Sequence, residues 1–136
     1  MDTPDITIRT EQAADGAPIR EVLVSAFGTG QEAALVDRLR QNGRLLLSLV
    51  AVCAGEVVGH IAFSEVTIGD GNASEKGAGL APMAVSPQWQ KRGIGARLIR
   101  AAVAACEELG VGFIVVLGEP EYYRRFGFAP ASLRGM

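Results

Sequence analysis

The chain has 136 residues, of which 49% are hydrophobic and 21% are charged, and its formal net charge is −2. This composition excludes a disordered chain and a collagen-like repeat. The slightly acidic balance argues against a general nucleic-acid-binding surface. No apolar run reaches the length of about 18 residues that a transmembrane helix needs, so we expect no membrane association. The first five residues lack the basic flank and apolar core of a signal peptide, and we expect a cytoplasmic protein.

The residue types that most often bind metals are few and scattered. Cys53 and Cys106 lie far apart in the sequence and form no C-x-x-C pattern, so we expect neither a disulfide framework nor a zinc site. Both cysteines are expected to be buried as small hydrophobic side chains. The sole histidine, His60, has no nearby zinc ligands and no nucleophile elbow. We expect it to be a strand residue without a catalytic role, and we expect no bound metal.

The predicted elements follow from periodicity and from turn residues. Alternating or continuous apolar residues predict strands. Helices are predicted where Asp15 and Pro18 form a start signal and where glycines such as Gly43 and Gly110 follow the last turn. The expected strands are Ile6–Thr10, Leu45–Cys53, Val57–Ile68, Ala78–Val85 and Phe113–Leu117. The expected helices run from Asp15, as cap, to about Phe27, from Gln31 to about Asn42, over Gly93–Leu109 and, for one or two turns, over Glu121–Phe126.

This order predicts an α+β arrangement within the broad α/β class, with a mixed, mostly antiparallel central sheet flanked by helices. The strands on either side of Ala54-Gly55 are expected to form an antiparallel hairpin. The strand–helix–strand unit from Ala78 to Leu117 is expected to be a right-handed crossover between two parallel strands. Pro82 lacks an N–H group, so it marks a bulge or an unpaired edge; alternatively, the strand starts only at Met83.

The segment Gln90-Lys91-Arg92-Gly93-Ile94-Gly95 opens the longest predicted helix directly after a strand and a Ser-Pro turn. Glycines allow a ligand to approach the backbone closely, and the free N–H groups of a helix start favour an anion. The segment is not a Walker loop, because Gly95 is followed by Ala96-Arg97. It also lacks the third glycine of the dinucleotide fingerprint. By itself the pattern leaves two readings open, a phosphate site and a tight turn that leads into a helix.

Three segments in order resemble the GNAT superfamily of N-acetyltransferases. They are Leu80–Pro87, Gln90–Ile99 and Tyr123–Phe128. Ala26-Phe27-Gly28 followed by Glu32-Ala33, and the short stretch Leu117–Tyr123, resemble a small, compact bacterial subgroup of that superfamily. The resemblance implies a single acetyltransferase-like domain over residues 1–136 and acetyl-CoA as co-substrate. The family normally continues with a further strand that this sequence lacks; a truncated chain, a natural short form and a homodimer that completes the sheet are three explanations. The implied cofactor-binding residues are Met83, Ala84, Val85, Gln90, Lys91, Arg92, Gly93, Ile94, Gly95, Ala96 and Tyr123.

The resemblance also implies roles in acetyl transfer to an amine. A backbone N–H of Val85 or Ala84 stabilises the oxyanion, and Tyr123 is the general acid, with Tyr122 as the second choice. Two residues, Glu65 and Glu119, are candidates for the general base that deprotonates the amine.

Phe27 and Glu32 are the expected acceptor-binding residues, and the acidic balance favours a cationic acceptor. Trp89 is expected either to pack on the loop or to hold an adenine. The function expected is an acetyl-CoA-dependent N-acetyltransferase acting on a primary amine of a small molecule or peptide; the alternatives are a catalytically weak acyl-CoA-binding regulatory module and an interaction domain.

Overall fold

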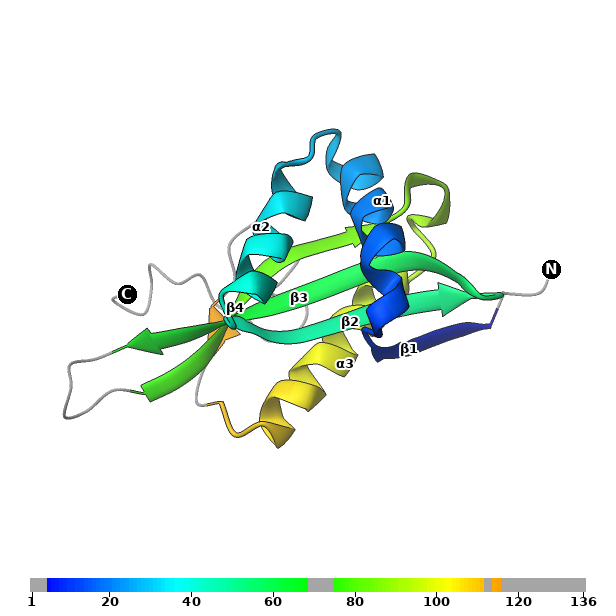
Figure 1. Cartoon of the computed structure of the whole chain (residues 1–136). Coiled ribbons are helices and arrows are strands. Elements are labelled where there is room, and N and C mark those ends of the chain that lie inside the picture. The colour runs from blue at the N-terminus through cyan, green and yellow to red at the C-terminus, as the bar shows by residue number, and fades with distance from the viewer. Residues whose placement is uncertain (1–4, 69–74, 112–113, 116–136) are drawn as a thin grey trace.

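The computed structural model describes residues 5–68, 75–111 and 114–115 and contains a central sheet covered on both faces (Figure 1). The strand order is β1-β2-β3-β4-β5, in which all neighbours are antiparallel except β4 and β5, which are parallel. The strands are β1 Ile6–Thr10, β2 Leu45–Cys53, β3 Glu56–Ile68, β4 Glu75–Val85 and β5 Ile114–Val115. The helices are α1 Gly16–Phe27, α2 Gln31–Gln41 and α3 Ile94–Glu108, with single 3-10 turns at Ala13–Asp15 and Pro87–Trp89. The predicted fold class is confirmed, including the crossover from β4 through α3 to a parallel β5.

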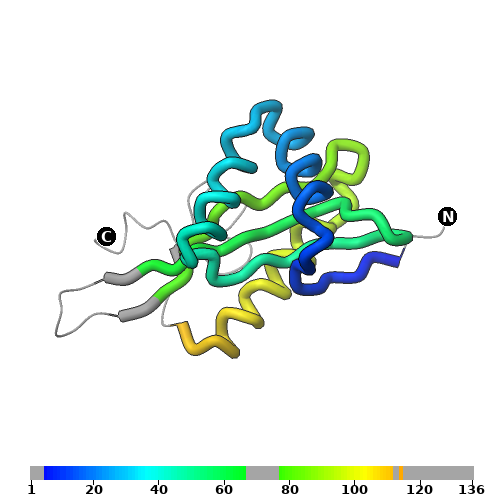
Figure 2. Tube along the Cα trace, in the orientation of Figure 1, coloured from blue at the N-terminus to red at the C-terminus, as the bar shows by residue number. Residues whose placement is uncertain are grey.

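Each face of the sheet carries its own hydrophobic core, because successive side chains of a strand point to opposite faces. Helices α1 and α2 lie side by side over one face, and α3 crosses the other (Figure 2). On the α3 face, Ile94, Leu98, Ala102 and Cys106 recur every four residues and form one buried stripe against the sheet. The core under α1 and α2 contains Ile19, Val22, Leu23, Ala33, Val36, Val50, Ala62 and Ala84.

The boundaries of the elements agree closely with the pattern of apolar and turn residues. Strand β2 spans the predicted residues, and Gly43 and Gly110 adopt left-handed backbone angles just beyond α2 and α3. Pro82 lies in a β-bulge, since Ile61 pairs with Met83 while Phe63 pairs with Leu80. The alternative in which the strand starts at Met83 is wrong, because β4 begins at Glu75. The predicted helical turns over Glu121–Phe126 lie outside the described residues.

Both cysteines are buried and free, as predicted. Burial raises the pKa of the Cys106 thiol to about 11, which keeps it protonated and unreactive. Within the part of the chain that the structure describes, no group of side chains is arranged to hold a metal ion. No helix formed by these residues is long and apolar enough to span a bilayer.

Asp15 is the N-cap residue of α1, as predicted, but its carboxylate makes no capping hydrogen bond to the helix. It accepts two hydrogen bonds from the Arg9 guanidinium, at 2.7 and 3.2 Å, and one from the Gln12 N–H at 2.7 Å. The Arg9 guanidinium is the main reason why the pKa of Asp15 lies below its usual value. This nearly buried carboxylate therefore joins the end of β1 to the start of α1.

Arg9→Ala is expected to destabilise the protein by about 1–2 kcal/mol, because it leaves a buried carboxylate with only one donor. Chemical denaturation monitored by circular dichroism measures the change. Arg20→Ala is the matched control, since Arg20 pairs with Asp37 on the exposed surface and such pairs contribute about 0–1 kcal/mol. Equal losses in the two variants would contradict the role assigned to Asp15.

Candidate functional site

A cavity of about 540 Å³ lies between the end of β4, the start of α3 and the last turn of α1. The segments that meet there are far apart in the sequence, and they include most of the residues expected to bind acetyl-CoA. Its lining consists of Ala26, Phe27, Met83, Ala84, Val85, Trp89, Gln90, Lys91, Gly93, Ile94, Gly95 and Ala96. One end is therefore formed by a glycine-containing helix start with a lysine, and the other by apolar side chains.

The start of α3 presents free backbone donors to the cavity. Gly93 has a φ of +82° and is the residue before the helix, whose first hydrogen bond runs from the Arg97 N–H to the Gly93 carbonyl. The N–H groups of Ile94, Gly95 and Ala96 precede that bond, so they have no partner within the helix. Together with the positive end of the helix dipole they form an anion site.

The loop before α3 holds an unusual backbone conformation. Lys91 has a φ of +64°, which costs a non-glycine residue on the order of 1 kcal/mol. Backbone strain of this kind gathers at functional sites, and Lys91 lines the cavity. Its ammonium group adds a full positive charge beside the helix start.

Two of the expected cofactor-binding side chains have other partners. The Gln90 side-chain amide donates a hydrogen bond of 3.0 Å to the Val85 carbonyl, which ties the loop to the end of β4. The Arg92 guanidinium lies 5.2 Å from the centre of the Trp89 ring, and Arg92 does not line the cavity. Trp89 itself is half-buried against the α3-face core, which fits the expected packing role on the loop.

The backbone of β4 turns one N–H group toward the unpaired side of the strand. The Ser86 N–H donates to the Val58 carbonyl at 2.9 Å, and Ala84 is the register partner of His60. Hydrogen-bonded pairs alternate along an antiparallel ladder, so the N–H of Val85, between Ala84 and Ser86, points away from β3. The described pairing between β4 and β5 covers only Ala78 and Gly79, so this end of β4 has no described neighbour on its second side.

The other expected site residues are distributed unevenly. Phe27 lines the cavity and is 41% exposed. Glu32 lies in the first turn of α2, outside the cavity lining, and accepts a hydrogen bond of 3.1 Å from the Thr29 hydroxyl. Glu65 is exposed and pairs with Ala78, six residues along β3 from the partner of Val85, a strand length of about 20 Å. The structure does not bring it to the cavity. Tyr122, Tyr123 and Glu119 lie outside the described residues.

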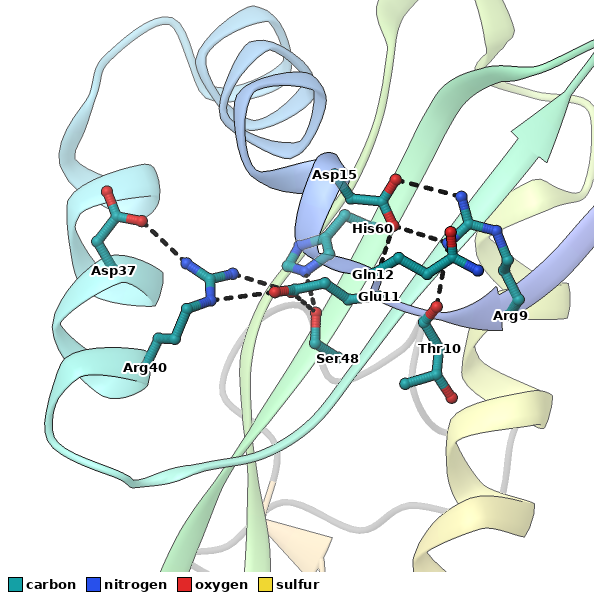
Figure 3. A network of polar contacts seen from close by, with 9 residues as sticks. All are labelled: Arg9, Thr10, Glu11, Gln12, Asp15, Asp37, Arg40, Ser48 and His60. Atoms are coloured by element: carbon teal, nitrogen blue, oxygen red, sulfur yellow. Dashed lines mark hydrogen bonds and ion pairs between the residues drawn. The ribbon is translucent and has the colours of Figure 1, made fainter.

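A buried polar network on the α1–α2 face was not predicted from the sequence (Figure 3). The Ser48 hydroxyl donates to Glu11 Oε1 at 2.5 Å and lies 2.9 Å from His60 Nε2. Arg40 donates two hydrogen bonds to Glu11, at 2.8 and 3.0 Å. His60 is fully buried, and its register partner is Ala84, which lines the cavity.

The network also fixes the protonation of His60. Because Ser48 donates its proton to Glu11, it accepts one from His60 Nε2, which leaves Nδ1 as a bare acceptor. No described residue gives His60 Nδ1 a hydrogen-bond partner. Burial lowers the pKa of His60 to about 4, so the ring is neutral at physiological pH. Its predicted strand position is confirmed, since it lies in β3.

Comparisons with known proteins agree with this geometry. The Acetyltransferase (GNAT) family matches residues 17–128. The uncharacterized N-acetyltransferase YjhQ of Escherichia coli K12 is 38% identical over 134 residues, which are 97% of this chain and 74% of that protein. A GNAT family acetyltransferase from Brucella melitensis, solved in complex with acetyl-CoA, has a TM-score of 0.87 and 42% identity, covering 95% of this chain and 86% of the other.

A second solved structure, Escherichia coli YhbS in complex with CoA, has a TM-score of 0.90 and 34% identity. The match covers 98% of this chain and 73% of YhbS. Residues 17–128, which match the family, include the residues that line the cavity, the start of α3 and the end of β4. This chain belongs to the GNAT family of acetyltransferases.

Proposed function

We propose that the protein is an acetyl-CoA-dependent N-acetyltransferase that acetylates a primary amine of a small molecule or peptide. The observation that carries this proposal is that one cavity joins the free amides at the start of α3 to the unpaired end of β4. Two relatives bound to acetyl-CoA and to CoA, at 42% and 34% identity, support the choice of co-substrate. Acetyl-CoA would supply the activated acetyl group.

The two ends of the cavity suit the two ends of this co-substrate. The amides of Ile94, Gly95 and Ala96, with the Lys91 ammonium, fit a pyrophosphate. The unpaired edge of β4 at Met83 fits the amides of a pantetheine arm, which add to a strand in the manner of another strand. Phe27 stands at the opposite, apolar wall, where the acceptor would enter.

Acetyl transfer needs three groups from the protein: a hydrogen-bond donor for the oxyanion, a general acid and a general base. The amine nitrogen adds to the acetyl carbon, and the carbonyl π electrons move to oxygen to give a tetrahedral oxyanion. Collapse of this intermediate re-forms the C=O bond and breaks the C–S bond, while the amine loses one proton and the departing sulfur gains one. The Val85 N–H, which points away from β3, is the proposed oxyanion donor. Tyr123 is the proposed acid, because a phenol with a pKa of about 10 can protonate a thiolate.

The proton of the amine needs a separate acceptor. Of the two carboxylates considered, Glu119 stays a proposal, whereas the strand length between Glu65 and the end of β4 leaves Glu65 too far away to act. Glu32 remains a proposed contact for a cationic acceptor at the start of α2.

Acetyl transfer to a broad panel of primary amines, measured by release of free CoA thiol, tests the proposal. Tyr123→Phe is expected to lower kcat by about a hundredfold or more, while the acetyl-CoA Kd measured by calorimetry stays within twofold of wild type. Tyr122→Phe shows which of the two neighbouring tyrosines is the acid. Tight acetyl-CoA binding without transfer to any amine would instead favour a regulatory acyl-CoA-binding module.

A further inference from the structure

Gly59 lies in β3 directly beneath the first turns of α3. A methyl group added to its α-carbon would lie 3.1 Å from Leu98 Cδ1, 3.3 Å from Ile94 Cγ2 and 3.4 Å from the Ala51 Cβ. The first two contacts are with the helix start, and Ile94 also lines the cavity. The space above Gly59 is therefore filled by the part of α3 that carries the free amides.

The reason for glycine at this position is space rather than backbone conformation. The described glycines with positive φ are Gly28, Gly43, Gly55, Gly93 and Gly110, and Gly59 is not among them. Glycine inside a strand weakens the strand, and it often marks a close approach by another segment. Here the approaching segment is α3, whose Leu98 and Ile94 are almost fully buried.

Gly59 is also the register partner of Val85. One backbone position thus touches the helix start on one side and is paired with the end of β4 on the other. A side chain at residue 59 would press on Leu98 Cδ1 and Ile94 Cγ2, which must then give by a few tenths of an ångström. Both side chains are almost fully buried, and a closely packed core passes such a shift on to the helix that carries them.

We propose that Gly59 is a positioning residue that fixes the height of the first turn of α3 above the sheet, and thereby the distance between the anion-binding amides and the Val85 N–H. This inference rests on the proposed function. The extended pantetheine arm sets an upper limit on the span between the pyrophosphate and the thioester of acetyl-CoA, so a larger separation between the two protein sites weakens binding at one of them. Displacement of a binding group by as little as 1 Å can lower a rate by about a hundredfold.

The test compares Gly59→Ala with wild type by calorimetric titration with acetyl-CoA. We expect the Kd to rise about tenfold, because the helix start must move by a few tenths of an ångström. Binding of S-acetylpantetheine, which lacks the pyrophosphate, is followed by NMR and is expected to change less than twofold. If Gly59 had a purely structural role, Gly59→Ala would weaken the binding of acetyl-CoA and of S-acetylpantetheine equally.

Gly79→Ala is the matched control. A methyl group there would lie 2.9 Å from Val66 Cγ2 and 3.3 Å from the Ser64 hydroxyl, on the same sheet but against residues of β3 rather than α3. It is expected to lower the Tm at least as much as Gly59→Ala while leaving the acetyl-CoA Kd within twofold of wild type. An equal rise in Kd in both variants would overturn the proposal, as would a folded Gly59→Ala protein with an unchanged Kd.

A rescue variant keeps the test decisive if Gly59→Ala does not fold. Leu98→Val removes the δ-carbon that lies nearest to the added methyl group. The double variant Gly59→Ala/Leu98→Val is expected to bind acetyl-CoA with a Kd within about twofold of that of Leu98→Val. A double variant that binds acetyl-CoA much more weakly than Leu98→Val contradicts the proposal. These readouts are binding constants, so a failure to find acetyl transfer would count against the proposed function without deciding the role of Gly59.

Discussion

Gly95→Val is expected to raise the acetyl-CoA Kd by at least a hundredfold while the protein stays folded. Gly95 lines the cavity in the first turn of α3, where the N–H groups have no partner within the helix. A branched side chain at this position fills the space that a phosphate needs to reach those donors. Loss of two or three charge-assisted hydrogen bonds, each contributing about 1.5–3 kcal/mol, accounts for the size of the effect. Calorimetric titration with acetyl-CoA measures it.

Ala104→Val controls for the helical cost of a β-branched residue. Ala104 is an exposed residue of the same helix, away from the cavity lining. Its replacement is expected to cost less than about 1 kcal/mol of stability and to leave acetyl-CoA binding unchanged. If Gly95→Val were to bind acetyl-CoA as tightly as Ala104→Val, the start of α3 would be only a turn that leads into a helix.

Lowering the pH from 7 to 5 is expected to reduce the free energy of unfolding by about 2 kcal/mol through His60 alone. Burial lowers the pKa of His60 to about 4 from its ordinary value of 6.5. Between pH 7 and 5, His60 becomes protonated in the unfolded chain but stays neutral in the folded protein. The free energy of unfolding therefore falls as the pH drops below 6.5 toward 4. Glu11, behind Ser48, favours the charged ring, while Arg40 opposes it.

A loss of stability between pH 7 and 5 can be assigned to His60, because it is the sole histidine and most carboxylates titrate below pH 5. Urea denaturation at pH 7, 6 and 5 gives the slope of the free energy of unfolding against pH. His60→Gln removes the titrating group, and we expect its stability to vary by less than about 0.5 kcal/mol over the same range. Identical slopes in the two proteins would show that His60 is not held neutral by burial.

Local patterns were sufficient to predict the described elements and the loop that lines one end of the cavity. The apolar run of β2, the missing N–H of Pro82 and the glycines at the start of α3 each act within a few residues, so their consequences can be predicted without a fold. The loop from Gln90 to Gly95 lies at the cavity as expected, because the strand and helix that flank it are adjacent in the chain.

Contacts between distant segments were not predictable in the same way. Asp15 matches the preference for a helix cap, yet the Arg9 guanidinium competes successfully for its carboxylate. Glu65 is a plausible base in sequence, but the register of β3 against β4 places it far from Val85.

The other surprises also depend on how the sheet and helices pack together. The network that joins Glu11, Arg40, Ser48 and His60 links four elements or loops, and the tight fit above Gly59 depends on the height of α3.

The most direct test of the account is a calorimetric comparison of acetyl-CoA with S-acetylpantetheine on the wild-type chain. The two ligands share the thioester and the pantetheine arm and differ in the phosphates and adenosine. If the amides at the start of α3 bind the pyrophosphate, acetyl-CoA binds at least a hundredfold more tightly than S-acetylpantetheine, a difference of about 3 kcal/mol. High salt is expected to reduce this difference in affinity. Equal affinities for the two ligands would contradict the assignment of this helix start as the anchor of the co-substrate.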